Sequence, residues 1–150
     1  MLIVFDIDGT LADLSHRLKH IKEEPKNWAE FHRRCTWDEP IAPMIALCNT
    51  LMADTTHDVV FVSGRNEAVR ERTVEWLDKK LSFPENFTMC LYMRAEDDHR
   101  PDYKVKLEIL LEVVALYGKK PDLVFDDRQQ VVDMWREHGI RVCQVADGNY

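Results

Sequence analysis

The sequence predicts an α/β fold in which a Rossmann-like parallel sheet carries helices on both faces. Short apolar runs, each ending in a polar residue, recur along the chain, and the segments between them change to a helical period. Strands that alternate with helices pair in parallel through right-handed crossovers. A small helical insertion is expected after the first strand, where this alternation is interrupted.

Five apolar runs are the expected strands. Continuous apolar runs of this length are typical of strands buried on both faces of a sheet. Ligands of open parallel sheets bind at the carboxyl ends of the strands, so the polar residues that follow each run are candidates for a site. The runs cover residues 2–5, 59–62, 87–93, 123–125 and 140–145.

Four segments between the runs place apolar residues on one helical face. Asn66 is the expected N-cap of the second helix, and Gly118 is expected to end the third. The expected core faces are Met44, Leu47, Cys48 and Leu51 in the first helix; Val69, Thr73, Trp76 and Leu77 in the second; Leu107, Leu110, Leu111, Val114 and Tyr117 in the third; and Val131, Val132 and Trp135 in the fourth.

Residues 13–42 do not fit the alternation and are interpreted as an insertion, or small cap, beside the mouth of the site. Two short helical patterns are separated there by Pro25. Between His16 and Arg34 the segment holds three Arg and three Lys against three Glu, so it is net positive. With this insertion, residues 1–150 are expected to form a single domain.

Composition narrows the class of protein. The chain has 150 residues, of which 45% are hydrophobic and 31% charged, as in ordinary globular proteins, and its formal net charge is −7. That charge argues against a protein that coats nucleic acid with a broad basic surface. No segment is apolar enough to cross a membrane, and the first apolar run ends too soon for a signal peptide.

The cysteines indicate the compartment. Cys35, Cys48, Cys90 and Cys143 show neither C-x-x-C nor zinc-finger spacing, so they are expected to be reduced and mostly buried. The expected location is the cytoplasm. The sequence predicts no oligomeric state.

Asp6-Ile7-Asp8-Gly9-Thr10 follows the first apolar run directly. Two carboxylates at i and i+2 can converge on one site, and a phosphate monoester repels them unless a cation such as Mg²⁺ lies beside them. Asp6 is the expected nucleophile, forming an aspartyl-phosphate, and Asp8 the expected general acid and base. The alternative is a turn whose acids bond to the loop backbone; the buried run before the acids favours the catalytic interpretation.

Ser63-Gly64-Arg65 ends the second run. A hydroxyl, backbone N–H groups and a guanidinium fork are suited to phosphate oxygens. The alternative is a helix cap, a role that Asn66 can take instead.

A lysine before the third helix is expected to neutralise the nucleophile and the transferred phosphoryl group. Spacing alone does not choose between Lys104 and Lys106, and either is also compatible with a solvated helix start. Asp126 and Asp127 end another apolar run, where adjacent acids require a cation. Asp126 is the expected metal ligand beside Asp6 and the backbone carbonyl of Asp8, whereas Asp127 is expected to cap the next helix.

These segments together resemble the four motifs of the haloacid dehalogenase (HAD) superfamily of phosphohydrolases, over essentially the whole chain. More narrowly, they resemble the 3′-phosphatase domain of phage-type polynucleotide kinase-phosphatase. The narrower resemblance rests on 62–65, on Arg100-x-Asp102-x-x-x-Lys106, on 126–136 and on the ending 144–150. There are two departures: the insertion is longer, and no G-x-x-x-x-G-K-[ST] loop occurs in this sequence.

The resemblance implies a Mg²⁺-dependent HAD-like core with the roles given above. It selects Lys106 as the motif lysine, oriented by Asp102. It also implies that Arg17 and Arg65 contact the substrate phosphate, together with Thr10, Ser63 and Gly64.

Three functions remain open on the sequence. The first is removal of 3′-phosphates from nucleic-acid ends, favoured by the motifs and by the positive insertion. The second is a phosphatase of free nucleotides or other small phosphoesters, favoured by the acidic net charge. The third is a receiver-like domain that holds an aspartyl-phosphate without turnover, which the presence of Asp8 argues against.

Overall fold

The structure is a computed structural model that describes residues 1–148. Its central sheet has five strands in the order β5-β4-β1-β6-β7, and every neighbouring pair is parallel. The predicted parallel α/β fold is therefore confirmed. Asn149 and Tyr150, which end the C-terminal segment used for the resemblance, lie outside the described residues. The strands are β1 (Leu2–Asp6), β4 (Asp58–Asn66), β5 (Cys90–Arg94), β6 (Leu123–Asp126) and β7 (Val142–Gln144).

The central strand β1 is buried along its whole length, as its apolar run predicts. Asp6 pairs in register with Val62 of β4, and Phe5 pairs with Phe125 of β6. The ends of β1 and β6 consequently lie beside the middle of β4, which is longer than its apolar run and continues to Asn66. Ser63 and Asp126 are each one residue beyond a partner of β1, which brings three predicted site positions to one edge of the sheet.

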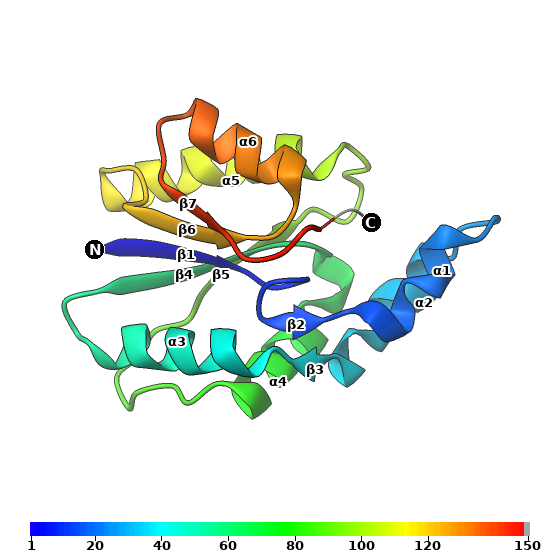
Figure 1. Ribbon diagram of the computed structural model, residues 1–150, viewed down its shortest axis with the longest axis horizontal. Helices are drawn as coiled ribbons and strands as arrows, with labels where there is room; N and C mark the ends of the chain where they lie inside the picture. The colour runs from blue at the N-terminus through cyan, green and yellow to red at the C-terminus, as the bar shows by residue number, and fades with distance from the viewer. Residues whose placement is uncertain (149–150) are drawn as a thin grey trace.

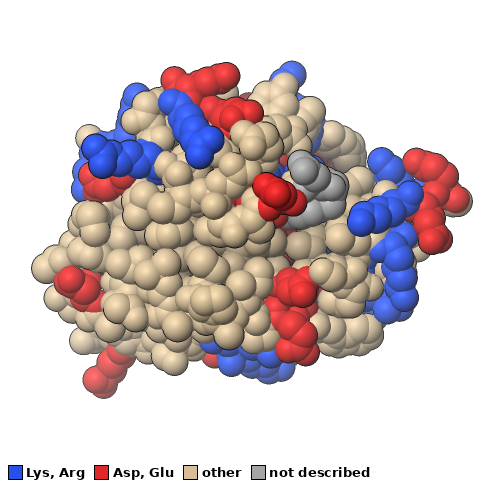
Figure 2. All heavy atoms as spheres, viewed as in Figure 1, with Lys and Arg blue, Asp and Glu red and all other residues tan. Residues whose placement is uncertain are grey.

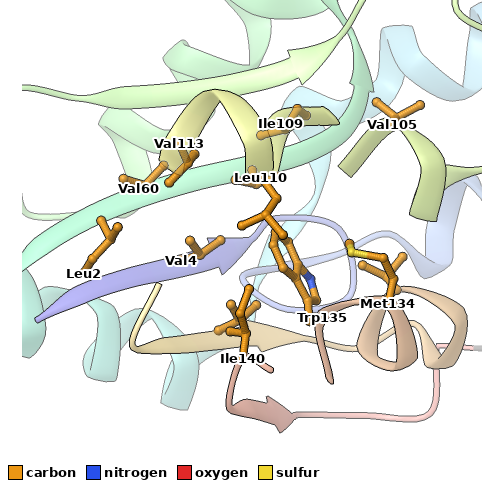
Figure 3. Packing of buried hydrophobic residues seen from close by; sticks show 13 residues of the cluster. Leu2, Val4, Val60, Val105, Ile109, Leu110, Val113, Met134, Trp135 and Ile140 are labelled. Atoms are coloured by element: carbon orange, nitrogen blue, oxygen red, sulfur yellow. The ribbon is translucent and has the colours of Figure 1, made fainter. Parts of the chain in front are cut away.

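Helices cover both faces of the sheet (Figure 1). On one face lie α5 (Asp102–Tyr117) and α6 (Gln129–Glu137); on the other lie α3 (Ala42–Ala53) and α4 (Arg70–Lys80). In Figure 3 the α5 residues Ile109, Leu110 and Val113 and the α6 residue Trp135 gather over β1 and β4. This packing fixes α5 and α6, and with them Lys106, over the end of β1.

Two predicted core residues are exposed. Leu47 of α3 is 36% exposed and Leu111 of α5 is 62% exposed. The buried face of α5 instead follows Val105, Ile109 and Val113, at intervals of four residues, and Leu111 points away from it. The other expected core residues of the four helices are buried or partly buried. The expectation that the cysteines are mostly buried holds for Cys35 and Cys48, whereas Cys90 is partly exposed and Cys143 is exposed.

The insertion begins and ends in a short antiparallel pair, β2 (Ala12–Asp13) with β3 (Glu39–Pro40). Between them lie the 3₁₀ helices η1 (Ser15–Arg17) and η2 (Arg34–Trp37) and the α-helices α1 (Lys19–Lys22) and α2 (Trp28–Arg33). Figure 1 shows α1 and α2 projecting from the core at the carboxyl end of β1. The insertion thus stands beside the edge of the sheet that carries the site.

A further 3₁₀ helix, η3 (Glu67–Val69), joins β4 to α4, and the Asn66 side chain caps it by accepting the N–H of Ala68. Among the described residues, no helix combines the length and the apolar character that crossing a membrane requires.

Candidate active site

The loop after β1 turns sharply between the two acids and the next strand. Gly9 has φ +85°, a conformation that L side chains rarely adopt, and a Cβ there would lie 2.0 Å from Oδ2 of Asp127. The carbonyl of Ile7 accepts the N–H groups of Leu11 and Ala12 and closes the turn. The turn keeps Asp6, which is 3% exposed, at the end of the buried strand.

Lys106 lies among three carboxylates at this edge of the sheet. Its Nζ donates to Oδ1 of Asp6 at 2.6 Å and to Oδ2 of Asp126 at 2.9 Å, and lies 3.6 Å from Oδ2 of Asp102. Lys104 is exposed, whereas Lys106 is buried. The structure therefore brings Lys106 to the predicted nucleophile and leaves Lys104 in solvent.

Burial dominates the electrostatics of this cluster. It raises the pKa of Asp6, and the neighbouring Asp126 and Asp127 raise that pKa further, outweighing Lys106. Burial by itself lowers the pKa of Lys106, but the charges of Asp126, Asp6 and Asp102 outweigh it and raise that pKa. The lysine is thus held as an ammonium between these acids.

Asp6, Asp126 and Asp127 could hold a metal ion, since one oxygen from each lies within 4.8 Å of the others. All three are buried, and the charges of Asp126 and Asp127 raise the pKa of Asp6. A divalent cation such as Mg²⁺ fits this set of carboxylate oxygen donors. The carboxylate of Asp8 is not in this cluster.

Asp127 differs from its expected role as a helix cap. Arg128 occupies the N-cap position of α6, and no side chain caps it there. The Asp127 carboxylate instead packs against backbone: a Cβ on Gly148 would lie 2.2 Å from its Oδ2, as close as the one on Gly9. Gly9 and Gly148 thus leave space for this carboxylate beside Asp6. The spacing of the motifs in the sequence did not indicate the contact with Gly148.

Asp8 faces two buried arginines. Its Oδ1 accepts from Nη2 of Arg17 at 2.6 Å and from Nη2 and Nε of Arg65 at 2.6 and 2.9 Å. Burial would raise the pKa of Asp8, but the charges of Arg17 and Arg65 outweigh it and hold that pKa well below its usual range. Asp8 is therefore an ionised carboxylate in the substrate-free protein.

Asp38, at the end of the insertion, was missed by sequence reasoning. It accepts from Arg17 and from Arg65 at 2.7 Å each through Oδ2, and its backbone carbonyl accepts the indole N–H of Trp76 at 2.8 Å. Both arginines thus bridge Asp8 and Asp38. A buried arginine requires a carboxylate partner, but that Arg17 is buried cannot be read from its sequence neighbours.

The remaining predicted phosphate contacts lie close to these groups. Ser63 is buried, and its Oγ accepts the N–H of Arg65 at 3.1 Å. Gly64 allows a close approach, since a Cβ there would lie 2.2 Å from Oδ1 of Asp102. Thr10 is buried, and its hydroxyl makes no hydrogen bond within the described part of the chain.

Asp102 is held from three sides. Nη2 of Arg94 donates to its Oδ1 at 3.1 Å, Nη1 of Arg128 lies 3.7 Å from its Oδ2, and Lys106 completes the set. Arg94 also donates to the carbonyls of Gly64 and Arg100. Asp102 is thereby fixed next to the lysine that the resemblance assigns it to orient.

A cavity of about 820 Å³ opens above the acids. Asp6, Asp8, Gly64, Asp102 and Lys106 line it, whereas Thr10, Arg17, Ser63, Arg65, Asp126 and Asp127 lie behind its surface. The insertion contributes Ile21, Lys26, Trp28, Ala29, Phe31 and His32. The last residue of β5, Arg94, and the following residues 98–101 also line the cavity. The cavity therefore leads from the predicted nucleophile to the insertion.

Comparisons with known proteins identify the family of this chain. The family model described as the polynucleotide kinase PNKP phosphatase domain matches residues 1–150. A putative bifunctional polynucleotide kinase/RNA ligase of Autographa californica nuclear polyhedrosis virus is 31% identical over 138 residues, which is 90% of this chain. The chain spans 18% of the length of that relative.

Solved structures give the same family and fold. A chain of the Pnkp1/Rnl/Hen1 complex superposes with a TM-score of 0.77 at 31% identity, over 99% of this chain and 47% of that one. A class C acid phosphatase from Bacillus anthracis shares the fold at 16% identity, with a TM-score of 0.64 over 99% of this chain and 67% of that one. With the family model matching every residue, the chain belongs to the polynucleotide kinase PNKP phosphatase domains, which are phosphatases of the HAD type.

Proposed function

We propose that this chain removes 3′-phosphates from nucleic-acid ends, with Mg²⁺ as cofactor and a phosphorylated Asp6 as intermediate. The observation that carries the proposal is the contact of Lys106 with both Asp6 and Asp126 at the head of an open cavity. A lysine beside one buried carboxylate, together with a cation held by the neighbouring acids, would attract a phosphate dianion to that carboxylate. Bound Mg²⁺ would supply positive charge that offsets the charge of the phosphoryl oxygens.

In the first step an Oδ atom of Asp6 forms a bond to phosphorus while the bond from phosphorus to the 3′ oxygen breaks. The leaving 3′ oxygen takes a proton from Asp8, which yields a hydroxyl end. Lys106 donates a hydrogen bond to Asp6 and so orients the nucleophile, and its charge favours the ionised form that burial opposes.

In the second step a water molecule attacks the phosphorus of the phosphorylated Asp6. Asp8, now ionised, accepts a proton from that water, and the bond between Asp6 and phosphorus breaks. Inorganic phosphate leaves, Asp6 returns as a carboxylate and Asp8 carries the proton needed for the next cycle.

The arginines next to Asp8 reconcile its two roles. In the substrate-free protein Arg17 and Arg65 hold Asp8 ionised, which suits a base but not an acid. A substrate phosphate that draws donors of Arg17 and Arg65 toward its own oxygens weakens their contacts with Asp8 and raises its pKa. Binding of the phosphate thus favours the protonated form that the first step needs.

The choice of a nucleic-acid end rests on family and on charge. Relatives in this family include a putative polynucleotide kinase/RNA ligase and a chain of the Pnkp1/Rnl/Hen1 RNA repair complex. The insertion carries basic side chains interleaved with acids, at the right of the view in Figure 2. Basic groups beside an open cavity favour a polyanion over a small ester that carries a single phosphate.

A substrate panel tests the proposal. Phosphate release in Mg²⁺ is measured from DNA and RNA oligonucleotides phosphorylated at the 3′ end or the 5′ end, from free nucleotides and from sugar phosphates. We expect release chiefly from 3′-phosphorylated ends and its loss in a chelator. Brisk release from small metabolites alone would remove the nucleic-acid substrate, and a phosphorylated Asp6 stable for many minutes without turnover would favour a phospho-acceptor domain.

The proposal also covers the extent of the domain and the cellular compartment. Residues 1–150 act as one catalytic domain, with 13–42 as its cap. The cytoplasm is the proposed compartment, because all four cysteines are unpaired.

A further inference from the structure

Trp28 is a large aromatic residue on the wall of the active-site cavity. Its side chain is 50% exposed, although an indole buried in a core would remove far more apolar surface from water. It begins α2, whose start is fixed by Asn27: the Asn27 side chain accepts the N–H of Glu30 at 3.0 Å. The ring is therefore held at the cavity by a capped helix and not by a mobile loop.

Two further rings, those of Phe31 and His32, pack against Trp28. Phe31 meets it edge-on with 5.8 Å between ring centroids, and His32 stacks on it at 6.2 Å with 27° between the planes. Burial lowers the pKa of His32 to about 4, so its imidazole is uncharged at neutral pH. The Trp28 and His32 rings are nearly parallel, and Phe31 meets both of them edge-on. We call these three uncharged side chains the aromatic wall.

The aromatic wall and the phosphate chemistry share one cavity. Asp6 and Lys106 line that cavity together with Trp28, Phe31 and His32. Lys26, on the loop before Trp28, also lines it and forms no ion pair with the described residues. A substrate whose phosphate lies at Asp6 thus shares this cavity with the flat apolar ring of Trp28 and with the cationic side chain of Lys26.

A nucleotide has the chemistry that matches this pair of features. Its base presents a flat π face that stacks on aromatic side chains irrespective of sequence, and its neighbouring phosphodiesters are attracted to a lysine. A sugar phosphate has neither a flat face nor a second anion. We propose that Trp28 stacks on the base of the nucleotide that carries the phosphate, and that it thereby selects nucleotide ends over other phosphate esters. This inference rests on the proposed function and names Trp28 as a residue that determines substrate specificity.

The test compares two oligonucleotides that differ only in the terminal base. Both carry a 3′-phosphate; in one the last residue is an ordinary nucleotide, and in the other it is an abasic tetrahydrofuran. Trp28→Ala is expected to raise KM about tenfold for the first and to leave the second unchanged. Trp28→Phe keeps a flat ring and is expected to retain most of the preference.

Trp37 offers a matched control in the same insertion. It is 58% exposed, does not line the cavity, and contacts the guanidinium groups of Arg33 and Arg34 at 5.6 and 5.4 Å from the ring centroid. Trp37→Ala is expected to leave KM for both oligonucleotides unchanged. We expect circular dichroism and Tm to show that each variant is folded, because both tryptophans are at least half exposed and contribute little to the core.

The outcomes separate this inference from the proposed function. Wild-type protein that acts equally well on the ordinary and the abasic end would overturn the role of Trp28 alone. So would a Trp28→Ala variant that loses activity equally on both, or one that changes only the oligomeric state. Wild-type protein that hydrolyses sugar phosphates but neither oligonucleotide would overturn the proposed function and this inference together.

Binding gives a readout that does not need turnover. In an Asp6→Asn background, affinity for the ordinary and the abasic oligonucleotide is measured by fluorescence anisotropy. Adding Trp28→Ala is expected to weaken binding of the ordinary end about tenfold and to leave the abasic end unaffected. Equal weakening of both ends contradicts a contact to the base.

Discussion

Asp38 accepts two hydrogen bonds from Arg17, from Nε at 2.8 Å and from Nη2 at 2.7 Å, and both side chains are fully buried. The insertion thus provides the carboxylate that positions an arginine on Asp8, at the edge of the sheet. His16 lies on the same carboxylate, with Nε2 at 2.8 Å from Oδ1. The insertion therefore helps to hold Arg17 and Arg65 at Asp8, and it also forms a wall of the cavity.

Asp38→Asn tests this arrangement. Losing the charge leaves two buried guanidinium groups with Asp8 as their remaining carboxylate, and we expect a loss of about 3 kcal/mol in unfolding free energy, measured by urea denaturation. Because Arg17 and Arg65 are then bound more tightly by Asp8, kcat is expected to fall at least tenfold. Glu30→Gln is the control, since Glu30 pairs with Arg33 and Arg34 at the surface, and it should change neither quantity much. Unchanged kcat in Asp38→Asn would show that Asp38 serves stability alone.

Asp6→Asn tests the nucleophile. The amide retains the shape of the side chain but cannot attack phosphorus, so kcat is expected to fall on the order of 10⁴-fold. Lys106 still has Asp126 as a partner, so the fold should be retained. Rapid acid quenching with labelled substrate should trap phosphoprotein in the wild type and none in the variant. A variant with near-native rates would show that another group attacks phosphorus.

The sequence was sufficient to predict the sheet and the positions at its edge. An apolar run that ends in an acid is a local signal, and the order of such runs determines which strand ends meet. Asp6, Ser63 and Asp126 were found in this way. The structure places Asp6 and Asp126 at the ends of β1 and β6, and Ser63 within β4, one residue beyond the partner of Asp6.

Groups that depend on the path of the insertion were not found. Asp38 and Trp28 have no motif around them, because what they contact is decided by how 13–42 folds back on the core. Asp127 was misassigned for a related reason. Its position before α6 suggested a helix cap, whereas its carboxylate packs against Gly148, a residue distant in the sequence. Leu111 was misassigned because an apolar residue on a helix does not reveal which neighbours cover it.

Lys106→Gln tests the charge between the acids. Removing the ammonium leaves Asp6 and Asp126 facing each other and removes a donor aimed at the transferred group, so we expect kcat to fall on the order of 10²- to 10³-fold. Lys104→Gln, an exposed lysine two residues earlier, is the matched control and should remain near wild type. Steady-state kinetics at saturating Mg²⁺ measure both. Equal effects of the two substitutions would contradict a specific role for Lys106.

Asp126→Asn tests the metal site. If Asp6, Asp126 and Asp127 hold Mg²⁺, the ion stabilises the fold by about 2.7 kcal/mol at 100 times its Kd, and Tm rises with its concentration. The variant is expected to lose most of that rise and to need more Mg²⁺ for half-maximal rate. Asp133→Asn, on the exposed side of α6, should behave as wild type. A Tm of the wild type that does not respond to Mg²⁺ would argue against this site.

His32 predicts how stability depends on pH. Its pKa is lowered from 6.5 to about 4, because burial outweighs the attraction of Asp8, and Arg17, Arg65 and Arg94 lower it further. Between these two values the unfolded chain binds a proton at this residue that the folded chain does not, so stability is retained above pH 6.5 and lost as the pH falls toward 4.

The expected loss from this residue is about 2 kcal/mol between about pH 7.5 and about pH 5. It is measured as the difference between wild type and His32→Gln in urea denaturation at the two pH values, because the other titrating groups are common to both proteins. The variant should lose less stability than the wild type over this interval. Parallel losses in the two proteins would mean that His32 takes up its proton in the folded state, and that the aromatic wall beside Trp28 becomes cationic in mild acid.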